Sequence, residues 1–146
     1  MIDKFEGEYA FLSNFAYSFI SDGNIMFPTV EHYFQAAKTL NMKDYEAIAA
    51  TDTPGQAKRL GRNVELREDW EEVKEQIMLD ALRKKFERPS FRTRLLATNN
   101  EELIEGNYWH DNTWGDCYCD RCKDIKGKNL LGKLLMQVRE EIKSSM

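Results

Sequence analysis

The fold is decided by the stretch DGNIMFPTVEHYFQAAK at residues 22–38, in which a turn, a short strand and a helix follow one another. Asp22-Gly23 is a hairpin signal, because glycine takes the positive φ that a tight turn needs and short apolar runs lie on both sides. Pro28 is expected to end the second strand. Thr29 is a typical N-cap for a helix that we expect to continue to about Leu40.

Outward from this stretch the chain is predominantly helical. Thr53-Pro54-Gly55-Gln56 is a capping box with proline at the first helical position, which predicts a helix ending at Gly61. The longest predicted helix begins near residue 70 and ends before Pro89, with acidic residues at its start and basic residues at its end, as the helix dipole favours. We also expect short helices over 44–51 and 91–96, a short strand at 103–105, a loop over 106–127 and a final helix over 129–142. Together these predict an α+β fold, a mainly helical single domain over residues 1–146 with a small N-terminal β-sheet.

Composition excludes several classes of protein. The chain has 146 residues, the size of one domain, and no apolar run exceeds four residues. We therefore expect no membrane span, no signal peptide and a cytoplasmic location. The formal net charge is −4, which argues against binding that depends on broad neutralisation of nucleic-acid phosphates.

The helix after Thr29 carries a polar stripe beside its apolar face. Advancing about 100° per residue places Glu31, Gln35 and Lys38 within about 60° of one another. A carboxylate, an amide and an amine would then lie in one line next to the core. The alternative is a solvated edge whose two charges suit the helix dipole, and periodicity alone favours that alternative.

Two further segments have residues suited to a nucleotide. Lys58, Arg59 and Arg62, with Arg67 just beyond, are cations that can hold a phosphate, although such a run is more often a solvated face. Residues 107–116, NYWHDNTWGD, combine two tryptophans with Asp, Asn and His. They offer stacking surfaces for a planar ring and acceptors for ribose hydroxyls. The equally weighted alternative is that the tryptophans fill the core and the polar residues make turns.

The three cysteines form a C-x-C-x-x-C pattern at Cys117, Cys119 and Cys122. An odd and crowded set is not a disulfide framework. With His110 as a fourth ligand the thiolates can bind a soft metal such as zinc. A single cluster is a weaker signal than two paired knuckles, so the sequence favours free thiols on a loop. We expect no metal and no cofactor.

Several segments, in this order, together resemble the YbiA-like family, also called the NADAR superfamily. They are FLSNF at 11–15, FPTVEHYFQAAK at 27–38, TPGQAKRLGR at 53–62, WG at 114–115, GKNLLG at 127–132 and LM at 135–136. The resemblance implies an N-glycosidase. Some members of that family cleave phosphoribose from an aminopyrimidine of the riboflavin pathway, and others remove ADP-ribose from guanine in nucleic acid.

The resemblance also implies roles for individual residues. Cleavage of a C1′–N bond passes through an oxocarbenium-like state, which a carboxylate near C1′ stabilises, and Glu31 is the first choice for that carboxylate. Lys38 would reach the ribose, as a hydrogen-bond donor or as an amine attacking the open-chain aldehyde. Asp111 is the second acidic candidate. The implied substrate-binding residues are Asn14, Phe15, Gln35, Lys58, Arg59, Arg62, Trp114, Gly115 and Asn129.

Some alternatives stay open. Asn129 lies where the final helix begins, so an N-cap is a strong alternative role for it. Residues 116–123 stand where many family members have a short glycine-rich turn, which leaves the choice of substrate open. The expected partner is a nucleotide-like small molecule or an ADP-ribosylated base in nucleic acid, with no membrane and no protein partner. A noncatalytic ADP-ribose or NAD-binding module and a metal-stapled adaptor are the competing functions.

Overall fold

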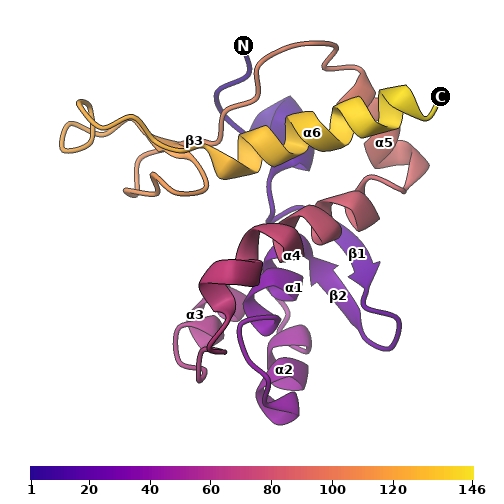
Figure 1. The fold of residues 1–146 in the computed structure, drawn as a ribbon, viewed down its shortest axis with the longest axis vertical. Coiled ribbons are helices and arrows are strands. Elements are labelled where there is room, and N and C mark those ends of the chain that lie inside the picture. Colours follow the sequence, from indigo (N-terminus) through magenta and orange to yellow (C-terminus); the bar gives the residue numbers. More distant parts are fainter. The chain divides into compact units, whose positions relative to one another are not determined.

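The computed structural model describes residues 1–146, and its contacts divide the chain into two compact units. One consists of Met1–Ser13 together with Arg88–Met146, and the other is Asn14–Glu87. We call them the terminal unit and the central unit. Figure 1 shows the helices and strands of each.

The central unit begins with an antiparallel hairpin of β1 (Tyr17–Ser21) and β2 (Met26–Thr29). The carboxylate of Asp22 accepts hydrogen bonds from the backbone N–H of Asn24 and of Ile25, at 2.8 and 2.7 Å, and Gly23 has a φ of +104°. The Asp-Gly turn predicted from the sequence is thus confirmed. Pro28 lies within β2 rather than ending it, opposite the irregularity in β1, where a missing N–H is tolerated.

The helix α1 (Val30–Ala36) starts where the sequence predicts and ends earlier than expected. The Thr29 side chain accepts a hydrogen bond from the backbone N–H of His32 at 3.1 Å, which confirms the N-cap. Past Ala36 the chain makes a tight turn, and the Lys38 carbonyl accepts from the backbone N–H of Arg67 at 2.8 Å. The prediction of a helix to Leu40 is wrong because a distant residue supplies this partner.

Three more helices complete the central unit: α2 (Met42–Ala49), α3 (Pro54–Gly61) and α4 (Trp70–Lys85). The Thr53 and Gln56 capping box is formed and α3 ends at Gly61, as predicted. The α1 helix packs against all three. Its apolar face joins a core of buried side chains from every element: Ile20, Phe27, Val30, Phe34, Ile48, Ala57, Trp70, Met78 and Leu82.

The terminal unit contains a short 3₁₀ helix, η1 (Gly7–Leu12), and the helices α5 (Pro89–Leu96) and α6 (Leu130–Ser144). The sequence did not predict η1. The strand expected at 103–105 is reduced to a single parallel bridge between Ile2 and Leu103. Two-residue strands β3 (Gly106–Asn107) and β4 (Asp116–Cys117) pair in parallel inside the segment predicted to be a loop.

The predicted fold class is confirmed: the protein is α+β and mainly helical, with a small antiparallel sheet near its N-terminus. No helix combines the length and apolar character that crossing a bilayer requires.

Candidate functional site

The centre of the candidate site is a buried carboxylate on α1. Glu31 is 8% exposed and Gln35, one turn later, is 4% exposed. The side-chain amide of Gln35 donates to Oε1 of Glu31 at 2.8 Å. The backbone N–H of Glu31 donates to the Asn14 carbonyl at 3.1 Å. The stripe predicted from the sequence is therefore not a solvated edge, because its acid and amide are buried and bonded to each other.

Gln35 has an acceptor to spare. Its Oε1 is buried and has no hydrogen-bond partner, although buried polar atoms of proteins are nearly always bonded. The oxygen faces α3, where a Cβ added to Gly61 would lie 2.0 Å from it. Gly61 is therefore required for the close approach of α3 to α1. This role had no signal in the sequence beyond the glycine itself.

Lys38 lies in the turn just after α1 and is partly buried. Burial lowers the pKa of its amine; the negative charge of Glu31 opposes this, and the positive charges of Arg62 and Lys58 add to it. Glu31, Lys38, Lys58 and Arg62 thus share one electrostatic neighbourhood. An amine with a lowered pKa is neutral more often at neutral pH, which suits it to act as a nucleophile.

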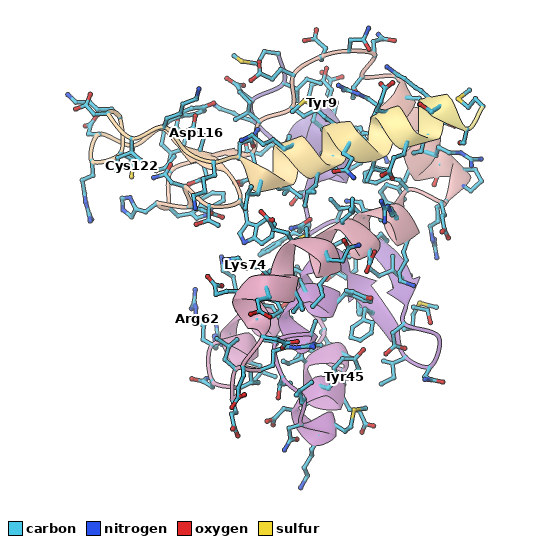
Figure 2. All side chains as sticks on the ribbon, in the orientation of Figure 1. Tyr9, Tyr45, Arg62, Lys74, Asp116 and Cys122 are labelled. Carbon is cyan, nitrogen blue, oxygen red and sulfur yellow. The ribbon has the colours of Figure 1, made fainter.

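The four cations predicted as a phosphate site, Lys58, Arg59, Arg62 and Arg67, have different surroundings in the structure. Lys58 and Arg62, four residues apart, act on the pKa of Lys38, and Figure 2 labels the Arg62 side chain. Arg59 and Arg62 are both exposed, but Arg59 is not among the charges that act on Lys38. Arg67 makes a two-pronged ion pair with Asp69, with nitrogen–oxygen distances of 2.6 and 3.1 Å. Because its backbone also bonds Lys38, Arg67 braces the turn after α1.

Asn14 and Phe15 precede β1 in the same unit. The Nδ2 of Asn14 lies 3.7 Å from the sulfur of Met78, and its Oδ1 is buried without a partner. Phe15 is 44% exposed. Asn14 therefore holds the start of α1 through its carbonyl and has a second unused acceptor.

The other predicted residues belong to the terminal unit, where each has a local structural role. Oδ1 of Asp111 accepts from the backbone N–H of Thr113 and Trp114, at 3.1 and 2.9 Å. A Cβ on Gly115 would lie 2.2 Å from the Glu105 carbonyl oxygen, so the chain passes too closely for any other residue. For residues 107–116, the sequence left open that the polar residues make turns, and Asp111 has that role.

Asn129 does not cap α6. Its side chain makes no bond to the start of the helix. Instead its Nδ2 donates to the Leu103 carbonyl at 2.9 Å, and its Oδ1 accepts from the backbone N–H of Glu105 at 3.0 Å. The N-cap alternative is wrong, because a φ of +51° directs this side chain to the 103–105 segment.

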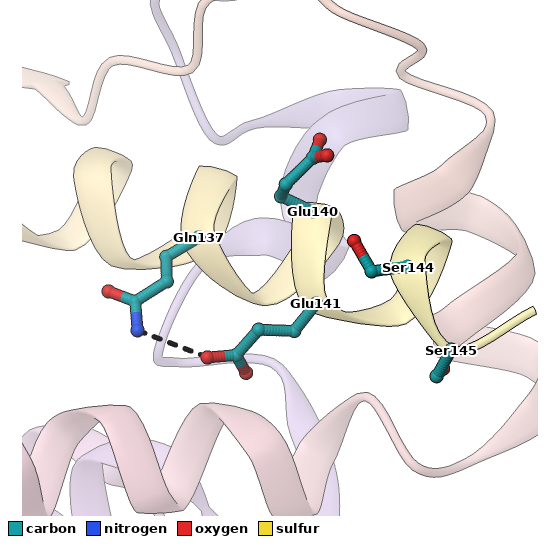
Figure 3. Close-up of a pocket in the computed structure, with 5 residues that line it drawn as sticks. All are labelled: Gln137, Glu140, Glu141, Ser144 and Ser145. Carbon is teal, nitrogen blue, oxygen red and sulfur yellow. Dashed lines mark hydrogen bonds between the residues drawn. The ribbon is translucent and has the colours of Figure 1, made fainter.

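A pocket along the last turns of α6 is lined by Gln137, Glu140, Glu141, Ser144 and Ser145 (Figure 3). Gln137 donates to Glu141 there at 3.1 Å. The lining has two carboxylates and no cation, so it is unsuited to a phosphate-bearing ligand.

One group of side chains has the composition of a metal site. The ligand atoms of His110, Cys117, Cys119 and Cys122 all lie within 4.8 Å of one another. Figure 2 labels Cys122 on this loop.

Comparison with known proteins agrees with the resemblance seen in the sequence. The NADAR domain model matches residues 2–143. N-glycosidase YbiA of Shigella flexneri serotype 5b is 47% identical over 139 residues, covering 92% of this chain and 82% of that protein. A riboflavin biosynthesis protein of Vibrio vulnificus is 34% identical over 137 residues, covering 92% of this chain and 36% of that protein.

A solved structure supports the same conclusion. The NMR structure of the E. coli protein YbiA matches with a TM-score of 0.82 at 42% identity, covering 99% of this chain and 88% of that one. The matching fold, the family model over nearly the whole chain and the similarity to the Shigella protein agree: this chain belongs to the NADAR domain family.

Proposed function

We propose that this chain, a glycosidase of the NADAR family, hydrolyses the C1′–N bond of a phosphoribosyl or ADP-ribosyl N-glycoside in the cytoplasm. The observation that carries the proposal is the buried carboxylate of Glu31 in one electrostatic neighbourhood with Lys38, Lys58 and Arg62. One acid, one perturbed amine and two further cations match a substrate that develops positive charge at C1′ and carries phosphate nearby.

The chemistry follows from this distribution of charge. As the C1′–N bond breaks, its electron pair stays with the nitrogen of the departing base, and positive charge spreads over C1′ and the ring oxygen. The Glu31 carboxylate stabilises that charge. It also accepts a proton from the water whose oxygen bonds to C1′. Glu31 passes this proton on to the departing nitrogen, so that one water is consumed: its hydroxyl ends on C1′ and its proton on the released base.

Lys38 has two roles compatible with its environment. As an ammonium it donates a hydrogen bond to the ribose. As a neutral amine it attacks C1′ of the open-chain form, expels the base amine and forms a Schiff base that water then hydrolyses. The burial that lowers its pKa favours the second role.

Phosphate and ribose contacts follow from the same residues. Lys58 and Arg62 bind the phosphate, since two cations suit one phosphate group. The unpartnered Oε1 of Gln35 accepts a ribose hydroxyl, which would satisfy a buried acceptor that has no partner within the protein. Asn14, Phe15, Arg59, Asp111, Trp114, Gly115 and Asn129 stay predicted contributors, with Asp111 the second acid.

Of the two substrate classes, a phosphoribosyl aminopyrimidine is our first choice. The riboflavin biosynthesis protein of Vibrio vulnificus aligns with 92% of this chain, and that pathway contains such N-glycosides. A net charge of −4 also suits a small substrate better than a long nucleic acid. ADP-ribosylated guanine in DNA is the second choice.

The test is to incubate the purified protein separately with a phosphoribosyl aminopyrimidine and with ADP-ribosylated guanine DNA, and to identify the released base by mass. We expect free aminopyrimidine and ribose 5-phosphate from the first. Release from the DNA alone would transfer the assignment to the second substrate. Intact glycoside in both, with measurable ADP-ribose or NAD binding, would instead establish the noncatalytic module.

A further inference from the structure

The loop between β3 and α6 gathers three sulfurs around one ring nitrogen. Nδ1 of His110 lies 3.3 Å from the sulfur of Cys119, 3.4 Å from that of Cys122 and 4.0 Å from that of Cys117. The four residues come from positions up to 12 apart in the chain. All four ligand atoms fall within 4.8 Å of one another.

Hydrogen bonds to the ring nitrogen alone do not account for this convergence, although the cysteine side chains also bond to one another. A ring nitrogen of neutral histidine either donates one hydrogen or accepts one, so it can satisfy one sulfur fully. Three sulfurs at 3.3 to 4.0 Å from the same nitrogen exceed that capacity. A cation among the four atoms would satisfy all of them at once.

The spacing matches a tetrahedral zinc site. With Zn–S bonds of about 2.3 Å and Zn–N bonds of about 2.0 Å, a tetrahedron separates sulfur from nitrogen by roughly 3.5 Å. The observed distances, 3.3, 3.4 and 4.0 Å, bracket that value. We propose that His110 Nδ1 and the thiolates of Cys117, Cys119 and Cys122 bind one zinc ion.

The backbone of the loop already holds these ligands in place. Pairing of β3 with β4 sets Cys117 beside Asn107, and the Cys117 N–H donates to Asn112 at 2.9 Å. The backbone N–H of His110 donates to the sulfur of Cys117 at 3.3 Å, a contact that stabilises a thiolate. A φ of +69° at His110 directs the ring to the sulfurs.

Burial and charge favour a structural role for the metal. Cys117 and Cys122 are 1% and 5% exposed, and four protein ligands leave no open position for a substrate or water. Three thiolates around Zn²⁺ leave one net negative charge. The metal would fix the segment from His110 to Cys122, which includes Trp114. This site is distinct from the proposed glycosidase chemistry.

The test measures metal directly and uses no substrate. The full chain is purified under reducing conditions, its zinc content is measured, and metal-stripped protein is titrated with zinc and with cobalt. We expect one zinc per chain, and cobalt absorption bands typical of tetrahedral thiolate ligation. Reduced, folded protein that holds no zinc and takes none up would overturn the proposal, as would cobalt bands without thiolate character.

Variants separate the ligand set from its surroundings. Cys119→Ser and His110→Ala each remove one ligand while keeping the more buried cysteines, and we expect zinc affinity to fall at least about tenfold. Asp120→Asn is the matched control, since it removes a potential metal-binding carboxylate from the same loop without touching the four ligands. Zinc binding lost in Asp120→Asn, or unchanged in both ligand variants, would contradict the assignment.

Discussion

The site around Glu31 on α1 and the loop over residues 105–129 differ in how far the hydrogen-bonding capacity of their polar side chains is filled. On α1, the buried Oε1 of Gln35 has no partner, and in the turn after α1 burial lowers the pKa of the Lys38 amine. In the loop, Asn107 uses both ends of its amide: Nδ2 donates to the Asp111 carbonyl at 2.8 Å, and Oδ1 accepts from the Trp109 N–H at 3.2 Å.

This difference separates polar groups that are available to a ligand from polar groups that hold the protein's own structure. Polar groups with unmet bonding capacity in a buried setting are costly and mark a place where a ligand completes the bonding. Polar groups whose bonds are filled within their own loop hold that loop in shape. By this criterion we place the proposed substrate chemistry at the α1 site, whereas Asp111 and Asn129 make hydrogen bonds that hold the loop.

Apart from Glu31, the largest predicted effect on activity is at Lys38. Lys38→Met should lower the rate of base release by about a hundredfold or more, because both proposed roles need the amine. For the Schiff-base role, the wild-type rate should rise with pH through the lowered pKa of Lys38 as the amine loses its proton, whereas a hydrogen-bonding ammonium would make the rate fall over the same range. Borohydride trapping of a substrate adduct checks the Schiff base, with Lys43→Met as the exposed control. A variant with wild-type turnover would remove Lys38 from the mechanism.

Gly61→Ala comes next, because it pushes a methyl group against Gln35. The clash at 2.0 Å should lower the free energy of unfolding by about 1–3 kcal/mol and should slow base release by displacing Glu31's partner. Gly55→Ala on the same helix meets only the Thr53 hydroxyl at 3.9 Å and should be neutral or stabilising. Denaturant unfolding of both variants checks this. Equal losses in the free energy of unfolding would show that the close α1–α3 contact at Gly61 does not contribute to stability.

A smaller effect, on KM, is expected to differ between the neighbouring residues Arg59 and Arg62. Arg62→Ala should raise KM about tenfold, because a charge-assisted bond to phosphate is lost. Arg59→Ala should raise KM less, by about threefold, because Arg59 is not among the charges that act on Lys38 and a more peripheral contact contributes less. Steady-state kinetics with the phosphoribosyl substrate compare the two. The reverse order would place the phosphate nearer to Arg59 than to Arg62.

The smallest effect tests the loop. Asp111→Ala should lower the free energy of unfolding by about 1 kcal/mol, because the N–H groups of Thr113 and Trp114 lose their acceptor. Asp111→Asn keeps an oxygen there and should change it by less than about 0.5 kcal/mol. Thermal unfolding distinguishes them. Equal losses of stability in the two variants would show that the Asp111 side chain does not stabilise the turn by accepting these hydrogen bonds.

Local signals in the sequence predicted most of the fold. Thr29 and the Thr53–Gln56 capping box fix helix starts through bonds within four residues, and both are formed. The end of α1 was not predictable in this way, because the partner of the Lys38 carbonyl is Arg67, about thirty residues away. The single bridge at Leu103 likewise depends on Ile2.

The site was predictable only in part for the same reason. Helical spacing placed Glu31 beside Gln35, and the structure shows both buried. Periodicity does not reveal what covers a stripe, so residues alone favoured a solvated edge. The roles of Gly61 and Arg67 depend on tertiary contacts, with Gln35 and with the Lys38 carbonyl, which the local sequence does not reveal. The cysteine pattern was visible, but its convergence on His110 depends on a left-handed residue and on β3–β4 pairing.

The most direct test of the central claim is base release by Glu31→Gln, measured alongside ligand binding and folding. Glutamine keeps an oxygen that can accept the bond from Gln35, so the fold and ligand affinity should persist. Without the negative charge, release of the aminopyrimidine should fall by about a thousandfold, while the exposed control Glu46→Gln keeps wild-type turnover. A folded Glu31→Gln protein that releases base at the wild-type rate would contradict the claim that this buried carboxylate carries the chemistry.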